Sequence, residues 1–357
     1  MNLTRRRSIA GLIGTALAAA LTLTGCSSTE STSSPRKTAT GDTSSRLPAA
    51  EGKTSYPLTL ESPFGKTVLE KRPERIAAVV PNAIDTELLL SLGVMPVLSS
   101  SFVKEGGYLG KHGADDVKTY EFVMGEEVPV EAIAASKPDL IVAVGWTDGL
   151  GGVKLADHYD RLKSIAPVVT SPDTSSQLLI PWQDSIRVLG ETLDLVDAAK
   201  RVVDDHEKHF AALRKKHPEF EGLTATWAIF YGEANGLQYL SRPDSAPEAF
   251  LGELGFARNP GAREFARDAT VSDELLSKID ADVLLLGQSA AVDDKGMREL
   301  TGRDLFRNLG AVSSGNFVQL PPKTEDGGDL LWAISSGGPI GNKWATGHLV
   351  PRLADAL

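Results

Sequence analysis

An internal repeat is the feature that most restricts how this chain can fold. The segment "VPVEAIAASKPDLIVAVG" (residues 128–145) matches "TVSDELLSKIDADVLLLG" (residues 270–287) in its pattern. Each copy places a glutamate, Glu131 or Glu274, at the start of a short helical pattern, with an aspartate eight positions later and then an apolar run. These runs do not alternate polar with apolar residues, which is typical of strands that helices cover on both faces of a parallel sheet. The spacing of 143 residues exceeds that of solenoid repeats and predicts two similar α/β lobes.

The order of the patterns along the 357 residues divides the chain into two lobes and a connection. Strand and helix patterns alternate in residues 56–180 and again in residues 218–357, and each region has the usual domain size of about 100–200 residues. Residues 181–217 carry the longest helical pattern, which predicts one connecting helix. Gly190 and Asp194 are the positions where this helix is expected to break or bend.

The N-terminus has the pattern of an export signal. Three arginines at positions 5–7 precede an apolar run over residues 9–23, which is shorter than the roughly 20 residues of a membrane-spanning helix. The run ends in "LTGC", which resembles the cleavage box of bacterial lipoproteins. Residues 1–25 are therefore predicted to be a signal peptide and Cys26, the only cysteine, a lipid-attachment site. Residues 26–55 are rich in Ser, Thr and Pro and predict a flexible tether.

The acidic balance argues against a nucleic-acid partner. The full chain has 37 basic and 47 acidic residues and a net charge of −10. Removal of residues 1–25 deletes three arginines and no acids, so the mature chain carries about −13. Because nucleic-acid binding depends on Lys and Arg that neutralise phosphates, we expect no nucleic-acid partner.

Six phrases in order resemble one bacterial family. They are "KRPERIAAVV", "VEAIAASKPDLIVAV", "YDRLKSIAPVV", "PWQDSIRVLGETL", "LGELGF" and "LVPRLADAL". Together they are similar to the iron–siderophore substrate-binding lipoproteins of bacterial ABC importers. The resemblance implies two Rossmann-like lobes joined by one long helix, with a ferric siderophore held in the cleft between them and delivered to a permease dimer. It also implies a monomer that a lipid anchors to the outer face of the cytoplasmic membrane, without a cofactor of its own. The siderophore would supply the iron ligands, so no protein metal site is expected.

The two glutamates of the repeat are candidates for contact with the permease. In the family that the chain resembles, one glutamate on each lobe meets an arginine of each permease subunit, and Glu131 and Glu274 occupy matching positions. Their alternative role is to complement the positive end of a helix, which is worth about 0.3–1 kcal/mol. Asp273 is adjacent and replaces Glu274 if the alignment of the repeat shifts by one residue.

Cleft residues are expected in loops after the carboxyl ends of strands, where open α/β sheets hold ligands. The candidates are Asn82, Lys104, Tyr108 and Trp146 in the first lobe, and Tyr231, Tyr239, Arg242 and Trp332 in the second. Aromatic rings and cationic side chains suit a bulky, often anionic chelate, and Trp146, Tyr231 and Arg242 are the leading candidates. Core packing is the alternative for each aromatic residue, and it is the expected role of Trp182 and Trp227.

Other functions stay open at this point. The same scaffold could hold haem or a cobalamin, and a haem site would need an axial ligand such as Tyr231 or Tyr239. A secreted hydrolase or metal-dependent enzyme would need a nucleophile or a ligand set, whereas the sequence has neither a GxSxG motif nor a Cys and His pair. His206 and His209 lack the further ligands of a zinc site. A purely structural lipoprotein would not need two lobes with facing loops. We expect a binding protein and no enzyme.

Overall fold

The two copies of the repeat form equivalent strands in two separate sheets. The computed structural model describes residues 47–123, 125–147, 152–172, 178–290 and 292–357. The first copy contains α2 (Val130–Ala135) and β6 (Leu140–Ala143), and the second contains a 3₁₀ helix (Asp273–Ile279) and β12 (Val283–Gln288). β6 lies between β3 and β7, and β12 lies between β8 and β13. The predicted α/β fold with two lobes is confirmed.

The N-terminal lobe is built on short parallel strands. Its strands are β1 (Leu58–Ser62), β2 (Gly65–Leu69), β3 (Ile76–Ala78), β4 (Ser99–Ser100), β5 (Thr119–Tyr120), β6 and β7 (Val168–Thr170). β1 and β2 form an antiparallel hairpin, β3, β6 and β7 are parallel, and β4 is parallel to β5. A parallel bridge between Ala77 and Leu98 extends the main sheet past β3. Its helices are α1 (Ile84–Ser91), α2 and α3 (Leu155–Lys163).

The C-terminal lobe has a mixed sheet. Its strands are β8 (Thr224–Phe230), β9 (Leu237–Tyr239), β10 (Ala257–Arg258), β11 (Thr270–Val271), β12 and β13 (Phe317–Gln319). β8, β12 and β13 are parallel, whereas β9 is antiparallel to β8. Its helices are α6 (Ala246–Leu254), α7 (Asp294–Gly302), α8 (Asp304–Arg307), α9 (Gly310–Ser314), α10 (Leu330–Ser336) and α11 (Pro339–Ala356).

The aspartate of each repeat has the same structural role. The Asp139 carboxylate accepts hydrogen bonds from the backbone amides of Glu74 and Arg75, the latter at 2.7 Å, just before β3 begins. The Asp282 carboxylate accepts from the amide and the hydroxyl of Thr224, at 2.7 and 2.8 Å, where β8 begins. Each aspartate thus ties the strand that it precedes to the neighbouring parallel strand, which explains why the chain repeats this pattern.

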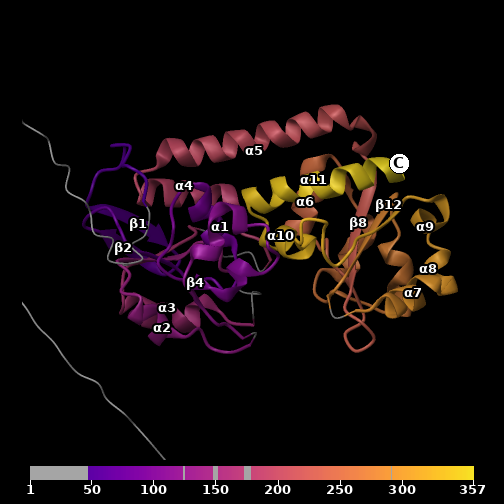
Figure 1. Cartoon of the computed structure of the whole chain (residues 1–357), viewed down its shortest axis with the longest axis horizontal. Coiled ribbons are helices and arrows are strands. Elements are labelled where there is room, and N and C mark those ends of the chain that lie inside the picture. Colours follow the sequence, from indigo (N-terminus) through magenta and orange to yellow (C-terminus); the bar gives the residue numbers. More distant parts are fainter. Residues whose placement is uncertain (1–46, 124, 148–151, 173–177, 291) are drawn as a thin grey trace, which may run out of the picture. The chain divides into compact units, whose positions relative to one another are not determined.

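The connection between the lobes was predicted as one helix, but the structure has two helices there. α4 (Trp182–Thr192) ends and α5 (Val196–Lys216) begins across a turn in which Asp194 adopts a left-handed backbone with φ of 52°. The amide of Leu195 donates to the carbonyl of Gly190 at 2.7 Å, which closes the turn. α5 packs against α4, and also against α6 and α11 of the C-terminal lobe (Figure 1). The break falls where the sequence indicated it.

The predicted tether also ends earlier than expected. Residues 47–55 are attached to the turn between α4 and α5, and the carboxylate of Asp194 accepts the amides of Gly52, Lys53 and Thr54 at 2.7–3.0 Å. The Glu51 carboxylate accepts two amides in the first turn of α5, at 2.6 and 3.0 Å. Hydrogen bonds to carboxylates therefore order a segment whose composition alone favours disorder. The predicted signal peptide, Cys26 and the rest of the predicted tether fall in residues 1–46, which lie outside the described residues.

Each lobe has its own apolar core. The N-terminal core joins β3, β6 and β7 to α1, α4 and the start of α5, and it includes Trp182, which is 4% exposed. The C-terminal sheet is covered on both faces, with Trp227 on one face and Tyr239 on the other. The expectation that Trp182 and Trp227 are core residues is confirmed. None of the described helices is both long and apolar enough to cross a membrane.

Candidate functional site

The parallel strands determine where a ligand site can form. Asn82 follows β3, Lys104 and Tyr108 follow β4, Tyr231 follows β8, and Trp332 lies in α10 after β13. These positions are at the carboxyl ends of strands in both lobes, the usual ligand edge of an open α/β sheet. Residues 148–151 and 173–177, which follow β6 and β7, lie outside the described residues.

An aromatic contact joins the two lobes at this edge. The rings of Phe102 and Trp332 have centroids 5.2 Å apart and a tilt of 31°. Gly106, with φ of +77°, packs on Trp332, and a side chain at this glycine would place its Cβ 2.7 Å from the Cβ of Trp332. Both rings are half-buried, so each keeps exposed surface. Phe102 was missed in the sequence, although it stands two residues before Lys104 in the same loop.

A backbone hydrogen bond between the lobes lies beside the contact of Phe102 with Trp332. The amide of Asp329 donates to the carbonyl of Gly106 at 2.8 Å, and the Asp329 carboxylate caps α10 by accepting the amide of Leu331 at 2.9 Å. Lys323 lies 3.5 Å from the same carboxylate. Burial and the charge of Asp329 raise the pKa of Tyr231, which is half-buried. Tyr231 and Trp332 therefore belong to one neighbourhood around Asp329.

Asn82 lies at a second contact between the lobes. Its side-chain oxygen accepts the amides of Ala83 and Ile84, the latter at 3.1 Å, at the start of α1. The hydroxyl of Ser336, at the end of α10, donates to the same oxygen at 3.2 Å. Asn82 is half-buried. Asn82 therefore shapes the start of α1 and contacts the end of α10 in the other lobe.

Tyr108 is a structural residue in this structure. It is 5% exposed, its hydroxyl donates to Oε2 of Glu87 at 3.0 Å, and its ring lies 5.9 Å from that of Trp344. Oε1 of Glu87 accepts the amides of Ile340 and Gly341, at 2.9 and 2.8 Å, at the start of α11. Burial raises the pKa of Glu87 to about 7, opposed by the hydrogen bonds from Gly341 and Tyr108. The expected ligand contact of Tyr108 is replaced by a buried link between the lobes.

Glu87 itself was missed in the sequence. It is fully buried in α1, although acidic residues are seldom buried without partners. Its position in an otherwise apolar helical run, "AIDTELLLSLG", was the available signal. Its partners Ile340 and Gly341 lie more than 250 positions away, so the sequence alone did not identify them.

Trp146, a leading candidate, is a core residue. It is 1% exposed, its indole nitrogen donates to the carbonyl of Val153 at 3.2 Å, and its ring stacks on His158 with centroids 6.0 Å apart. It follows β6 directly, as expected, but its large ring is more stable in the core of the lobe than in water. The cleft role expected for Trp146 is therefore wrong in this structure.

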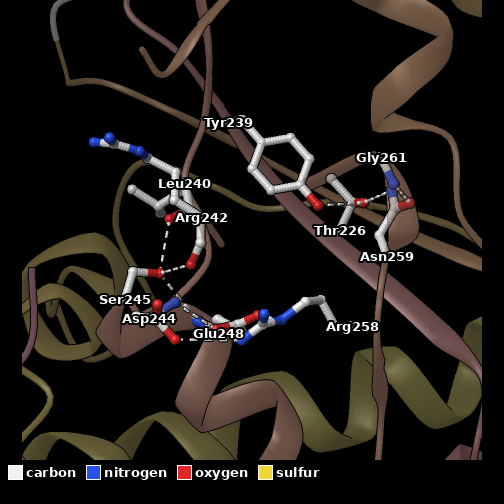
Figure 2. A network of polar contacts seen from close by, with 10 residues as sticks. All are labelled: Thr226, Tyr239, Leu240, Arg242, Asp244, Ser245, Glu248, Arg258, Asn259 and Gly261. Atoms are coloured by element: carbon white, nitrogen blue, oxygen red, sulfur yellow. Dashed lines mark hydrogen bonds and ion pairs between the residues drawn. The ribbon is translucent and has the colours of Figure 1, made fainter. Parts of the chain in front are cut away.

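The chain that carries Tyr239 and Arg242 runs toward the amino end of β8, away from the ligand edge. β9 runs antiparallel to β8, with Tyr239 opposite Ala228, so the chain leaving β9 reaches the amino end of β8. Figure 2 shows Arg242 directed away from the polar network around Thr226. The guanidinium of Arg242 donates to the carbonyls of Phe265 and Ala266, at 2.9 and 2.8 Å.

The ring of Tyr239 is also buried in the core of its lobe. It stacks on Phe265 with centroids 4.5 Å apart, and its hydroxyl is 3.3 Å from that of Thr226. The side-chain amide of Asn259 donates to the same threonine hydroxyl at 2.7 Å (Figure 2). The cleft roles expected for Tyr239 and Arg242 are wrong in this structure, because β9 runs antiparallel to β8 and leads the chain away from the carboxyl ends of the parallel strands.

The two candidate docking acids are on the surface. Glu131 lies in the first turn of α2, its side chain is 88% exposed, and Arg161 approaches it only to 4.0 Å. Glu274 is exposed in the first turn of its 3₁₀ helix. Its neighbour Asp273 forms an ion pair with Arg303, whereas Glu274 has no ion pair within the described residues. The geometry therefore favours Glu274 over Asp273.

Two hollows elsewhere have the size of small-molecule sites. One of about 810 Å³ lies between residues 53–58 and the helices α4 and α5. Another of about 440 Å³ lies between α1, α5 and the start of α11. Neither is lined by any of the eight candidate residues. Across the described ranges, no group of three or more His, Cys, Asp and Glu side chains is arranged to hold a metal ion.

Comparison with known proteins places the chain among binding proteins. The family profile described as periplasmic binding protein matches residues 83–324. The chain is 28% identical over 334 residues to a Bacillus subtilis (strain 168) protein named probable siderophore-binding lipoprotein YfiY, covering 90% of this chain and 91% of that protein. It is 24% identical over 314 residues to the Fe(3+)-citrate-binding protein YfmC of the same organism, covering 87% and 89%.

Solved structures share the fold. The Staphylococcus aureus SirA structure complexed with staphyloferrin B has a TM-score of 0.65 and 22% identity, over 83% of this chain and 98% of that one. The Streptococcus pneumoniae TIGR4 PiaA structure in complex with ferrichrome has a TM-score of 0.63 and 24% identity, over 84% and 98%. At these identities the likeness establishes the architecture of two lobes.

Proposed function

This chain belongs to the periplasmic binding protein family, and on that basis we propose that it captures a ferric siderophore between its lobes for an ABC importer. The observation that carries the proposal is the meeting of half-buried rings from both lobes, Phe102 and Trp332, where the parallel strands end. Relatives named for siderophore and ferric-citrate binding, which match nearly the whole chain, support the same ligand class. The family is one of binding proteins, so no reaction is assigned.

The residues proposed for ligand contact are those that keep exposed surface at this edge. They are Asn82, Lys104, Tyr231 and Trp332, with Phe102 added from the structure. Aromatic surface supplies contact area for the organic arms of a chelate, and a lysine supplies a cation. The siderophore supplies the iron ligands, which agrees with a site made of rings and amides.

The structure supports haem as the ligand less well than a ferric siderophore. Tyr239 is buried in a stack and does not border the site. Tyr231 is better placed, but burial and the negative charge of Asp329 raise its pKa, which disfavours the tyrosinate that would bind ferric haem. No observation favours a cobalamin.

The proposal extends to delivery and to location. Glu131 and Glu274, exposed on equivalent elements of the two lobes, are proposed to meet the two permease subunits. Exposed ion pairs of this kind are worth about 0.2–1 kcal/mol each and act mainly on orientation and association rate. Cys26 is proposed to carry the lipid that anchors an exported monomer to the outer face of the cytoplasmic membrane. The relative named a lipoprotein supports this anchor.

Titration of tryptophan emission tests the proposed ligand class. Ferric hydroxamate, catecholate and carboxylate chelates should be added to the full chain in turn, with haem and a cobalamin as controls. At least one ferric chelate should quench the emission saturably, because Trp332 has exposed surface at the proposed site. A saturable response to haem or the cobalamin alone would refute the siderophore proposal.

A further inference from the structure

The charged residues that follow the strand ends indicate which net charge of ligand the site can hold. Eight segments follow the carboxyl ends of β3 to β8, β12 and β13, and their described residues are 79–83, 101–109, 121–123, 125–129, 144–147, 152–154, 171–172, 178–181, 231–236, 289–290, 292–293 and 320–329. These segments are the ones that an open α/β sheet offers to a ligand. β10 is not among these strands, because it pairs with the first two residues of β8 and lies at the amino end.

These segments contain very few cations. Among these described residues the basic ones are Lys104, Lys154 and Lys323, and none is an arginine. The same described residues include nine acids. A site for a polyanion normally collects several lysines or arginines, because each buried negative charge needs a partner.

One of the three lysines, Lys323, has an acidic partner within the described residues. Lys323 lies 3.5 Å from the carboxylate of Asp329, which is 12% exposed and also caps α10. Lys104 is followed directly by Glu105, and both are exposed. Lys154 is exposed at the start of α3. The edge therefore offers isolated or paired lysines and no cluster of positive charge.

Arg242, the arginine expected at the ligand site, forms hydrogen bonds elsewhere. It donates to the backbone carbonyls of Phe265 and Ala266. Arg161 and Arg303 form ion pairs with Glu127 and Asp273, respectively. The described residues of these segments therefore include no arginine that could form the paired hydrogen bonds that hold carboxylate or catecholate oxygens.

The main classes of ferric chelate differ in charge in a way that this edge would distinguish. Three hydroxamates, each singly negative, neutralise ferric ion, and an added amine makes the chelate cationic. Three catecholates, each doubly negative, leave a trianion, and carboxylate chelates are also negative. We infer that this chain accepts neutral or cationic ferric tris-hydroxamates and discriminates against polyanionic ferric chelates. The inference rests on the proposed function and narrows its ligand class.

The physical reason is complementarity of charge as well as shape. A trianion between the lobes would lose solvation without gaining paired cations, and an exposed acid, Glu105, lies in the segment that follows β4. Discrimination by unpaired or like charges is a common source of specificity. A neutral chelate loses little solvation and gains contact with the rings of Phe102, Tyr231 and Trp332.

A charge series of ferric chelates tests the inference on the full chain. The probes are ferrichrome, which is neutral, ferrioxamine B, which is cationic, ferric citrate, and a ferric tris-catecholate, each titrated by tryptophan emission at low and high salt. The neutral and cationic chelates should bind at least about tenfold more tightly than the tris-catecholate. Higher salt should reduce this difference, because it screens repulsion.

The outcomes separate this inference from the proposed function. Equal or tighter binding of the tris-catecholate or ferric citrate would overturn the charge inference and leave siderophore binding intact. Absence of binding to every ferric chelate would instead remove the proposed function and the inference with it.

A charge-reversal variant provides a local test. Glu105→Lys should tighten binding of ferric citrate or the tris-catecholate several-fold and leave ferrichrome affinity unchanged. Glu70→Lys is the matched control, because Glu70 is an exposed acid beside the N-terminal hairpin and its reversal changes the net charge equally. Equal effects of the two variants would overturn the inference, since net charge and not the strand-end edge would then select the ligand.

Discussion

Replacement of Glu87 tests whether one buried carboxylate holds the two lobes together. The residue belongs to α1 of the N-terminal lobe, and its carboxylate accepts the amides of Ile340 and Gly341 and the hydroxyl of Tyr108. Glu87→Ala removes the acceptor from all three donors and leaves a cavity. Glu87→Gln keeps the shape and one acceptor oxygen, so it separates the charge from the packing.

The expected magnitudes follow from the number of donors that lose their partner. Each buried donor left unpaired costs about 1–3 kcal/mol, so Glu87→Ala should lower the free energy of unfolding by about 3–5 kcal/mol. Glu87→Gln still accepts the two amides of α11, and its amide group can donate to Tyr108. Its cost should be about 1 kcal/mol or less at low pH, where Glu87 is protonated and resembles glutamine.

The pH dependence gives a sharper test. Burial raises the pKa of Glu87 from an ordinary value of 4.5 to about 7. The folded protein therefore holds a proton that the unfolded chain releases, and this contribution to stability is complete below about pH 4.5 and is lost as the pH rises through about 7. The shift corresponds to about 3 kcal/mol. Asp85, whose pKa burial also raises to about 7, is present in both proteins and cancels from the comparison of wild type with Glu87→Gln.

Urea unfolding of wild type and both variants, followed by far-ultraviolet circular dichroism at several pH values, measures these differences. The stability of wild type relative to Glu87→Gln should fall between about pH 4.5 and 7. Glu70→Gln, at an exposed site, is the control and should show no such trend. A constant difference across this range would refute the argument from burial, and an alanine variant with less than about 1 kcal/mol of destabilisation would refute the count of unpaired donors.

Three further predictions concern the repeat and the site. Asp139→Ala and Asp282→Ala should each lower the free energy of unfolding by about 1 kcal/mol in urea, because each removes the acceptor at a strand start; unchanged stability would contradict this role. Charge reversal of Glu131 and Glu274 together should abolish iron uptake by cells and leave chelate binding in solution intact, whereas lost binding would place these acids in the fold or the cleft. Trp332→Phe should remove most of the ligand-dependent quenching, and undiminished quenching would show that this ring is not at the site.

Much of the architecture was predictable because it is encoded locally. The apolar runs of the repeat, the aspartate before each run and the helical pattern of residues 181–217 all lie within short windows of sequence. Such windows report burial and periodicity directly. The break at Asp194 was also indicated, but the attachment of residues 47–55 to it was not, since those hydrogen bonds join segments about 140 positions apart.

The site was predicted less well, because it depends on contacts between segments that are distant in the sequence. Tyr231 and Trp332 keep exposed surface near the strand ends, but the cleft role fails for Trp146, Tyr239 and Arg242. The sequence shows that a strand ends, yet the direction of β9 follows from its pairing with β8. A reversed strand sends its following loop to the opposite edge of the sheet.

The sequence by itself determined that this chain forms two similar α/β lobes, because patterns of apolar, polar and small residues act over a few turns of helix or one strand. Only the tertiary structure decided which side chains face the ligand edge and which link the lobes. Glu87 illustrates the distinction, since its role depends on amides 253 and 254 positions away that reach it only after both lobes have formed.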